Sequence, residues 1–404
     1  MTKVNKWTLG LAAVGLVSLP AVVQAEEKPN QMLTALSSTT ISGYVDTSAH
    51  WTLGTGNANP PAYAFNTPSK QDGFNLNVVD VTIEKPLDEG TWSAGYKIEL
   101  WYGPNAVRFN TSAGSGFGPS QVPGPAGASD LAIKQAYVVL RAPVGNGIDI
   151  KIGTFDTIIG YETANAPTNP NYTRSYGYTI EPTQQTGILA SYNVNKVIGI
   201  SAGIANTWSA GINNRSGRSE ASKSYMGALT LTAPDSFGPV AGSTLYAGIV
   251  DGYNTRIAND VTSYYVGGTL ATPIKQLKLG ASWDYAVAHD RGNGGRSVGR
   301  PTGYAQAAAV YASVQPTDSK FSFHFRGEWA DVTDVAATAG GGIPSEVLAL
   351  TGTIQYDLWA NVLSRLELRW DHSLAEGEPF GGKPGLAGQK RDEVLVAANI
   401  IYKF

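Results

Sequence analysis

The stretch FSFHFRGEWA, Phe321–Ala330, decides the fold because apolar and polar side chains alternate along most of its length. Successive side chains of a strand point to opposite faces, so this period of two separates the phenylalanines from the histidine, the arginine and the glutamate. Thr91–Tyr102 and Leu277–Ala288 show the same alternation. From Thr39 onward the chain repeats about sixteen such stretches of roughly ten residues, each followed by a turn or a loop. We therefore expect an all-β protein.

The strands favour a transmembrane β-barrel over a soluble β-sandwich. Segments of about ten residues are long enough to cross a bilayer, and aromatic residues near strand ends suit its two interfaces. The aromatic residues near strand ends on the apolar face are Trp51, Trp92, Tyr102, Tyr192, Trp329, Tyr356, Trp370 and Tyr402. We predict an up-and-down antiparallel barrel of sixteen strands.

The connections alternate between short and long, as this topology requires. Short turns are expected at Lys85–Gly90, Ala142–Gly147, Asn193–Lys196, Pro234–Ser243, Pro273–Gln276, Gln315–Ser319 and Trp359–Asn361. Long loops are expected at 52–73, 103–129, 156–183, 207–224, 252–260, 289–303, 331–345 and 373–391. Both termini then lie on the same side, and Thr40–Trp51 pairs with Asp392–Phe404 to close the barrel.

Composition excludes several other classes of protein. The chain has 404 residues, of which 42% are hydrophobic and 15% charged, with 47 glycines and no cysteine. Past residue 25 no apolar run approaches the roughly 20 residues of a membrane-spanning helix, so a helical transporter is excluded. The lack of cysteine excludes disulfides, thiol nucleophiles and thiolate zinc sites. The 29 basic and 32 acidic residues form no basic block, so we expect no nucleic-acid partner, and no cofactor or metal is implied.

The N-terminus has the features of a secretory signal peptide. Lys3 and Lys6 precede the apolar stretch Trp7–Val23, and small residues end it at Val23-Gln24-Ala25. We expect residues 1–25 to be cleaved, residues 26–38 to form a short periplasmic lead, and residues 39–404 to form the transmembrane barrel.

Three stretches carry a resemblance to a known family: Phe74–Leu87, Ile133–Glu162 and Leu363–Ser373. With them the chain resembles bacterial outer-membrane porins, and more narrowly the OmpL-like β-barrel porin family. The resemblance implies a passive channel in the outer membrane for small hydrophilic solutes and ions, surrounded by lipid and assembled as a homotrimer. The terminal Phe404 is similar to the signal that the barrel-assembly machinery recognises.

Charged side chains on one face of the strands are expected to line the lumen. A water-filled lumen carries such charges without the cost that applies in lipid. The resemblance implies that the third long loop folds into the barrel over Glu162–Glu181, so that Arg174 and the loop acids face Arg326, Arg365 and Arg369. An ordinary surface loop is the alternative. The predicted pore residues are Lys97, Glu99, Lys151, Glu162, Arg174, Glu181, Arg326, Glu328, Arg365, Glu367, Arg369 and Asp371.

Aromatic residues leave a second function open, a carbohydrate-selective channel in which rings stack on sugars. The candidates for stacking are Trp101, Phe155, Tyr161, Tyr172, Tyr176 and Tyr178. We prefer the interpretation that these rings pack the loop against the wall. A structural or adhesive barrel is a further alternative. No catalytic residue is predicted, because none of the four histidines has a nearby serine in a recognisable motif.

Overall fold

The computed structural model describes residues 32–33, 38–54, 56–109, 130–209, 211–216, 222–255, 259–289, 301–333 and 343–404. The predicted signal peptide and most of the predicted lead lie outside these residues.

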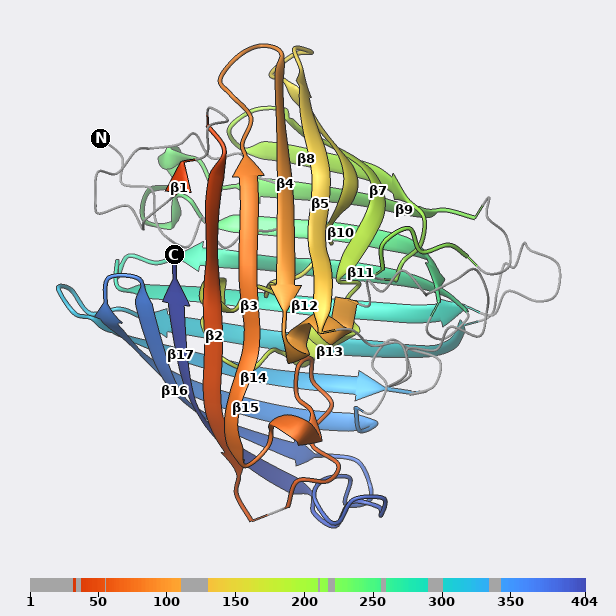
Figure 1. The fold of residues 1–404 in the computed structure, drawn as a ribbon, viewed down its shortest axis with the longest axis vertical. Helices are drawn as coiled ribbons and strands as arrows, with labels where there is room; N and C mark the ends of the chain where they lie inside the picture. The colour runs from red at the N-terminus through yellow and green to blue at the C-terminus, as the bar shows by residue number, and fades with distance from the viewer. Residues whose placement is uncertain are drawn as a thin grey trace.

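Sixteen strands, β2 to β17, form a single antiparallel barrel within the described part of the chain (Figure 1). Each strand pairs with the next along the chain, as the alternating pattern predicts. The strands are β2 Thr40–Thr52, β3 Gly73–Lys85, β4 Ser93–Tyr102, β5 Leu131–Ala142, β6 Ile148–Asp156, β7 Gln184–Asn193, β8 Ile198–Ala205, β9 Ser224–Thr232, β10 Thr244–Asn254, β11 Asn259–Ala271, β12 Leu277–His289, β13 Pro301–Val314, β14 Phe321–Val332, β15 Glu346–Trp359, β16 Val362–Ser373 and β17 Asp392–Lys403.

The barrel closes between its first and last strands, as predicted. β17 pairs with β2 from Leu395 opposite Thr52 to Lys403 opposite Tyr44. Beyond the strand, the amides of Gly43 and Phe404 each donate to the other residue's carbonyl at 3.0 Å. Closure leaves no unpaired edge in the described ring of strands β2 to β17, and lipid could not satisfy the backbone groups of such an edge.

The two faces of each strand differ in the predicted way. On β14, Phe321, Phe323 and Phe325 are 46%, 45% and 46% exposed, whereas Arg326 is fully buried. The exposed apolar side chains belong to the outer face of the barrel, and the buried, mostly polar ones to its inner face. The facing predicted from the period of two is therefore confirmed.

The structure adds small elements that the sequence pattern does not indicate. A strand of two residues, β1 (Met32–Leu33), lies within the predicted lead and pairs with β2. The helical pieces are short: η1 Pro68–Lys70, η2 Pro104–Phe109, η3 Ala166–Thr168, α2 Tyr176–Ile180 and η4 Asp235–Val240. In the described ranges no helix combines the length and apolar character needed to span a membrane.

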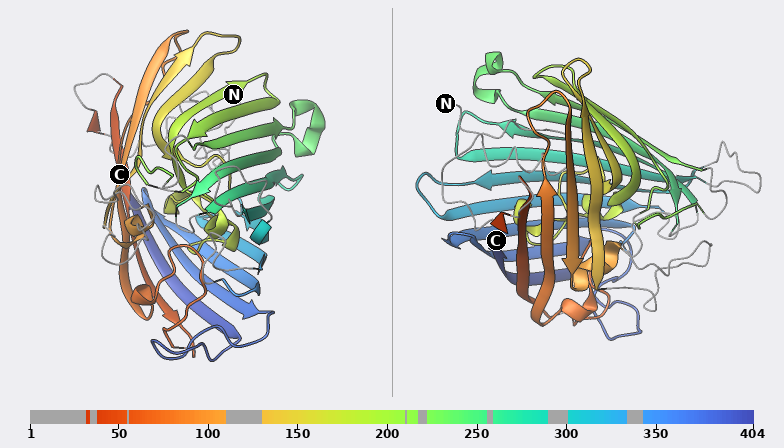
Figure 2. Two further views of the ribbon diagram at one scale, coloured as in Figure 1. Left: turned by 90° about the vertical axis from the view of Figure 1, so that its right-hand side faces the viewer. Right: turned by 45° about the horizontal axis from the view of Figure 1, so that its top comes forward.

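Two long connecting segments position the site. The first runs from 53 to 72 and contains η1, and the third runs from 157 to 183 and contains η3 and α2. Both turn back toward the strands in the two views of Figure 2. Buried residues of these segments join side chains of the inner face in three separate hydrophobic clusters.

Candidate functional site

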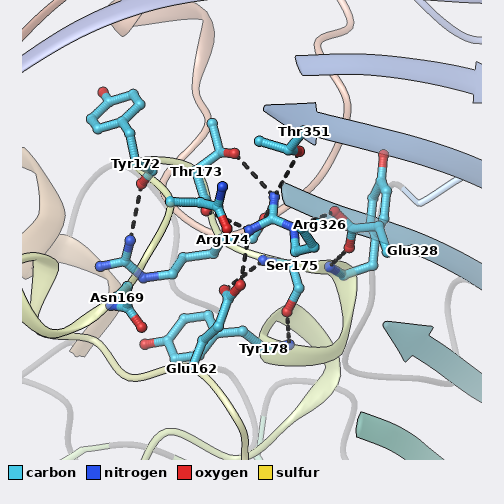
Figure 3. Close-up of polar contacts among 12 residues, drawn as sticks. Glu162, Asn169, Tyr172, Thr173, Arg174, Ser175, Tyr178, Arg326, Glu328 and Thr351 are labelled. Atoms are coloured by element: carbon cyan, nitrogen blue, oxygen red, sulfur yellow. Dashed lines mark hydrogen bonds and ion pairs between the residues drawn. The ribbon is translucent and has the colours of Figure 1, made fainter. Parts of the chain in front are cut away.

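The third segment is held to the inner face by a cluster of buried ion pairs (Figure 3). Arg326 Nη1 lies 2.8 Å from Glu162 Oε1, and Arg326 Nε lies 2.9 Å from Glu328 Oε1. Arg369 Nη2 lies 2.8 Å from Asp371 Oδ1 and 3.3 Å from Glu328 Oε1. Two arginines thus face three carboxylates, and every one of these side chains is almost fully buried. Breaking such a cluster would leave an uncompensated buried charge, so its members hold one another in place.

The short helix α2 docks on the same carboxylates. Ser175 caps its N-terminus by accepting a hydrogen bond from the Tyr178 amide. The Tyr176 amide donates to Glu328 at 2.6 Å, and the Tyr176 hydroxyl donates to Asp371 at 2.9 Å. A carboxylate at a helix N-terminus is favoured because the first amides have no partner within the helix.

The first segment takes part in this site, which sequence reasoning missed. The Tyr63 ring lies 3.7 Å from the guanidinium carbon of Arg369, and the Ala64 amide donates to Thr179 Oγ1 at 2.8 Å. Loops carry no periodicity, so no pattern marked Tyr63 for this position. The segment holds only two aromatic residues, Tyr63 and Phe65, so its composition gave no signal either.

A second set of contacts anchors the middle of the third segment. Arg365 Nη2 donates to the carbonyls of Ala166 and Asn169 at 3.1 and 2.6 Å. Glu367 accepts from the amides of Tyr172 and Thr173 at 2.6 and 2.9 Å. The strands β14 and β16 therefore both hold this segment, through side chains of alternating charge on their inner faces.

Arg174 contacts carbonyl oxygens and rings rather than a wall acid. Its guanidinium donates to the carbonyls of Thr163, Tyr172 and Ala164 at 2.9, 3.0 and 2.8 Å. Its guanidinium carbon lies 5.6 Å from the centre of the Phe65 ring. The charge of Arg174 is thus less directly compensated than those of Arg326 and Arg369.

The expectation that Glu181 faces a wall cation is wrong. Glu181 lies beside Asp284 of β12, and the buried Glu162 is a further neighbour. Burial raises the pKa of the Glu181 carboxyl well above its usual range, and the negative charge of Asp284 raises it further. Two carboxyl groups in contact avoid repulsion when one holds a proton, which explains how an acid comes to lie against an acid.

The predicted residues Lys97, Glu99 and Lys151 lie on another part of the wall. Lys97 Nζ is 3.3 Å from Glu99 Oε2, and Lys151 Nζ lies 4.9 Å from the Tyr137 ring centre. Lys134, which sequence reasoning missed, pairs with Asp156. A bulge shifts the register of β4 against β5 between Glu99 and Leu100. The run Ile133-Lys134-Gln135 breaks the alternation of apolar and polar side chains in β5. This break was the signal in the sequence for the bulge.

The candidate stacking residues do not gather in one place. Trp101 and Tyr178 belong to one hydrophobic cluster, Phe155 to a second and Tyr176 to a third. Tyr161 packs against the cluster of Phe155 and stacks on Tyr311, with ring centroids 4.0 Å apart. Tyr172 lies edge-on to His50, with centroids 6.0 Å apart. Because these rings are buried in separate clusters, they fit the interpretation that aromatic side chains pack the segments against the wall.

A closed barrel of sixteen antiparallel strands with an apolar outer face and a polar inner face defines the class of transmembrane porin-like barrels. A family model described as "Putative beta-barrel porin-2, OmpL-like" matches residues 38–404, and the chain belongs to that family. The protein is an outer-membrane porin of bacterial type, as the resemblance implied.

Solved structures share the fold at low sequence identity. The anion-selective porin from Comamonas acidovorans is 13% identical with a TM-score of 0.58, over 91% of this chain and 99% of that one. The outer-membrane channel DcaP of Acinetobacter baumannii is 11% identical with a TM-score of 0.57, over 92% and 99%. A trimer form of OmpT, an outer-membrane protein of Vibrio cholerae, is 11% identical with a TM-score of 0.51, over 91% and 99%. A search of curated proteins finds no match.

Proposed function

We propose that the protein is a passive diffusion channel for small hydrophilic solutes and ions, and that the third segment, 157–183, narrows its lumen. The single observation that carries this proposal is the set of bonds from Glu162, Tyr172 and Tyr176 to inner-face side chains of β14 and β16. These bonds support the proposal, because binding to inner-face groups would bring the segment into part of the cross-section that the wall encloses. Polar groups at a narrow point act most strongly on a passing solute.

Deletion of residues 164–172 tests this proposal. The stretch lies between the anchors at Glu162 and Tyr176 and includes the two carbonyls that Arg365 holds. Its removal is expected to raise the single-channel conductance in planar bilayers and to speed the swelling of liposomes in small sugars. A deletion of similar length in the segment 374–391, for example residues 381–387, serves as the control and should change conductance less.

Two outcomes would contradict the proposal in different ways. Purified wild-type protein that gives no conductance steps would argue against an open channel. A conducting protein whose conductance is the same with and without residues 164–172 would place the narrowest point elsewhere.

Assembly as a homotrimer and recognition of Phe404 by the assembly machinery are further proposals. The trimer form of OmpT of Vibrio cholerae, which shares the fold, supports the first. The pairing of Phe404 with Gly43 supports the second, because it places this residue at the seam where the barrel closes. Crosslinking of the protein in outer-membrane vesicles tests the trimer, and assembly of a variant lacking Phe404 tests the signal.

A further inference from the structure

We propose that the first segment, 53–72, limits the size of the solutes that pass, and that it does so as one unit with the third segment. This inference rests on the proposed channel function and adds to it a second element, with Tyr63 as a determinant of solute size. The first segment has five residues that are at most 8% exposed: Ala58, Tyr63, Ala64, Lys70 and Gln71. A connection that runs over the outside of a protein leaves most of its side chains in water. The first segment instead buries these side chains against neighbouring parts of the barrel.

The first segment is joined to helix α2 of the third segment. The Ala64 amide donates to Thr179 Oγ1 at 2.8 Å. The adjacent Tyr63 ring lies edge-on to the Tyr176 ring, with centroids 6.3 Å apart. One hydrogen bond and one ring contact thus connect consecutive residues of the first segment to the same short helix.

The second segment holds the other two together through Arg108 of η2. Its guanidinium donates to the Thr179 carbonyl at 3.3 Å. The guanidinium carbon lies 5.8 Å from the centre of the Phe65 ring and 5.6 Å from that of Tyr178, and these two rings are themselves 6.0 Å apart. A cation beside two aromatic rings is attracted to both, so one arginine contacts both segments.

The space between the first and third segments is too small for a solute. The cavity that Tyr63, Phe65, Tyr172 and Arg174 line together with β2 holds about 20 Å³, which is room for about one water molecule. A solute therefore has to pass around the two segments and not between them. The width of its path then depends on both segments.

Tyr63 joins the first segment to the wall. Its ring centre lies 3.7 Å from the guanidinium carbon of Arg369, which is also bonded to Asp371 and to the Arg174 carbonyl. Arg369 thus keeps partners without the ring. Wall residues of the same hydrophobic cluster include four alanines, Ala305, Ala307, Ala330 and Ala349. Such short side chains cannot refill the space that truncation of Tyr63 would open.

Tyr63→Ala tests the size limit, measured as single-channel conductance and as the swelling of liposomes in a monosaccharide and in a disaccharide. The variant is expected to raise the conductance. It should also raise the ratio of the disaccharide rate to the monosaccharide rate, because the larger solute is more sensitive to a narrow passage. Tyr63→Phe keeps the ring and should change both readings much less.

Tyr225→Ala is the matched control, because Tyr225 is an exposed tyrosine on β9. It should leave conductance and the ratio of rates unchanged. A folded Tyr63→Ala variant with the conductance and the ratio of the wild type would overturn the proposal, and so would an equal change in Tyr225→Ala.

A crosslink tests the union of the two segments without requiring conduction. The chain has no cysteine, so Ala64→Cys combined with Thr179→Cys introduces the only two thiols. Oxidation or a short thiol-specific crosslinker is expected to join them within one molecule, which mass spectrometry of the linked peptides detects. Conductance should be the same before and after crosslinking, because the segments already act as one unit. A link that does not form, or one that abolishes conductance, would overturn this union.

The two proposals fail in different ways. A protein whose conductance rises on deletion of residues 164–172 but not in Tyr63→Ala would retain the narrowing by the third segment and lose the role of the first. Protein that forms the crosslink but never conducts would overturn the channel function and leave the union of the segments in place. Should Tyr63→Ala fail to fold, Tyr63→Leu, which is smaller than tyrosine but still apolar, decides together with the crosslink.

Discussion

At the scale of single residues, Lys70 shows how burial changes a charge that sequence alone would treat as permanent. Burial lowers the pKa of the Lys70 ammonium to about 8, the charge of Asp46 opposes this change, and the charge of Arg174 adds to it. Lys70 lines a small pocket together with His50 and Asn105. The ammonium form is therefore lost as the pH rises through about 8.

At the scale of elements, the strands were predictable and the segments between them were not. The alternation in Phe321–Ala330 fixes which side chains of β14 face lipid, because a shift of one residue would turn every phenylalanine inward. The pairing of Arg326 with Glu162 joins residues 164 positions apart, and no local pattern encodes it. The family resemblance implied that the third segment folds into the barrel, but it gave no indication that Tyr63 of the first segment packs on Arg369. The neighbour of Glu181 was wrongly predicted, because the raised pKa that lets one carboxyl group lie against another is invisible in a count of formal charges.

The facing of β14 and β15 yields a test at this scale. Phe325→Arg places a charge on the outer face near the middle of β14, and we expect it to destabilise the folded protein in bilayers by about 2–4 kcal/mol. Gln355→Arg, on the inner face of β15 beside Asp357, should cost far less. Reversible urea unfolding in lipid vesicles measures both, and equal losses would contradict the assignment of the two faces.

At the scale of the whole molecule, the arginines of the site fall into two groups. Some face carboxylates of opposite charge, and others bond only to uncharged carbonyls. Arg326 and Arg369 face three carboxylates and contribute little net field, whereas Arg365 bonds to carbonyls and keeps Nε and Nη1 buried without a hydrogen-bond partner. Selectivity among ions depends on fixed charge within about 8 Å of the path at physiological salt. Arg365 is therefore the wall cation with the greatest expected influence.

Arg365→Gln is expected to shift the reversal potential in a potassium chloride gradient toward cation selectivity, because it removes one positive charge while glutamine can still donate to the Ala166 carbonyl. Lys320→Gln, at the end of a short turn, is the control and should leave the reversal potential unchanged. A shift of the same size in both variants would mean that the potential responds to total charge and not to position.

The pairing of β2 with β17 means that the order of the strands along the polypeptide could be changed without changing the barrel. The first and last strands are neighbours, and the start of β2 and the end of β17 lie at one rim of the barrel. Joining these two points by a short linker would therefore not strain the wall. The chain could then be opened at the turn between Trp359 and Val362, giving a circular permutant with the same ring of strands. In that permutant Phe404 would lie in the interior of the sequence while keeping its place beside Gly43. Such a molecule would show whether the geometry of closure depends on the order of the strands along the chain.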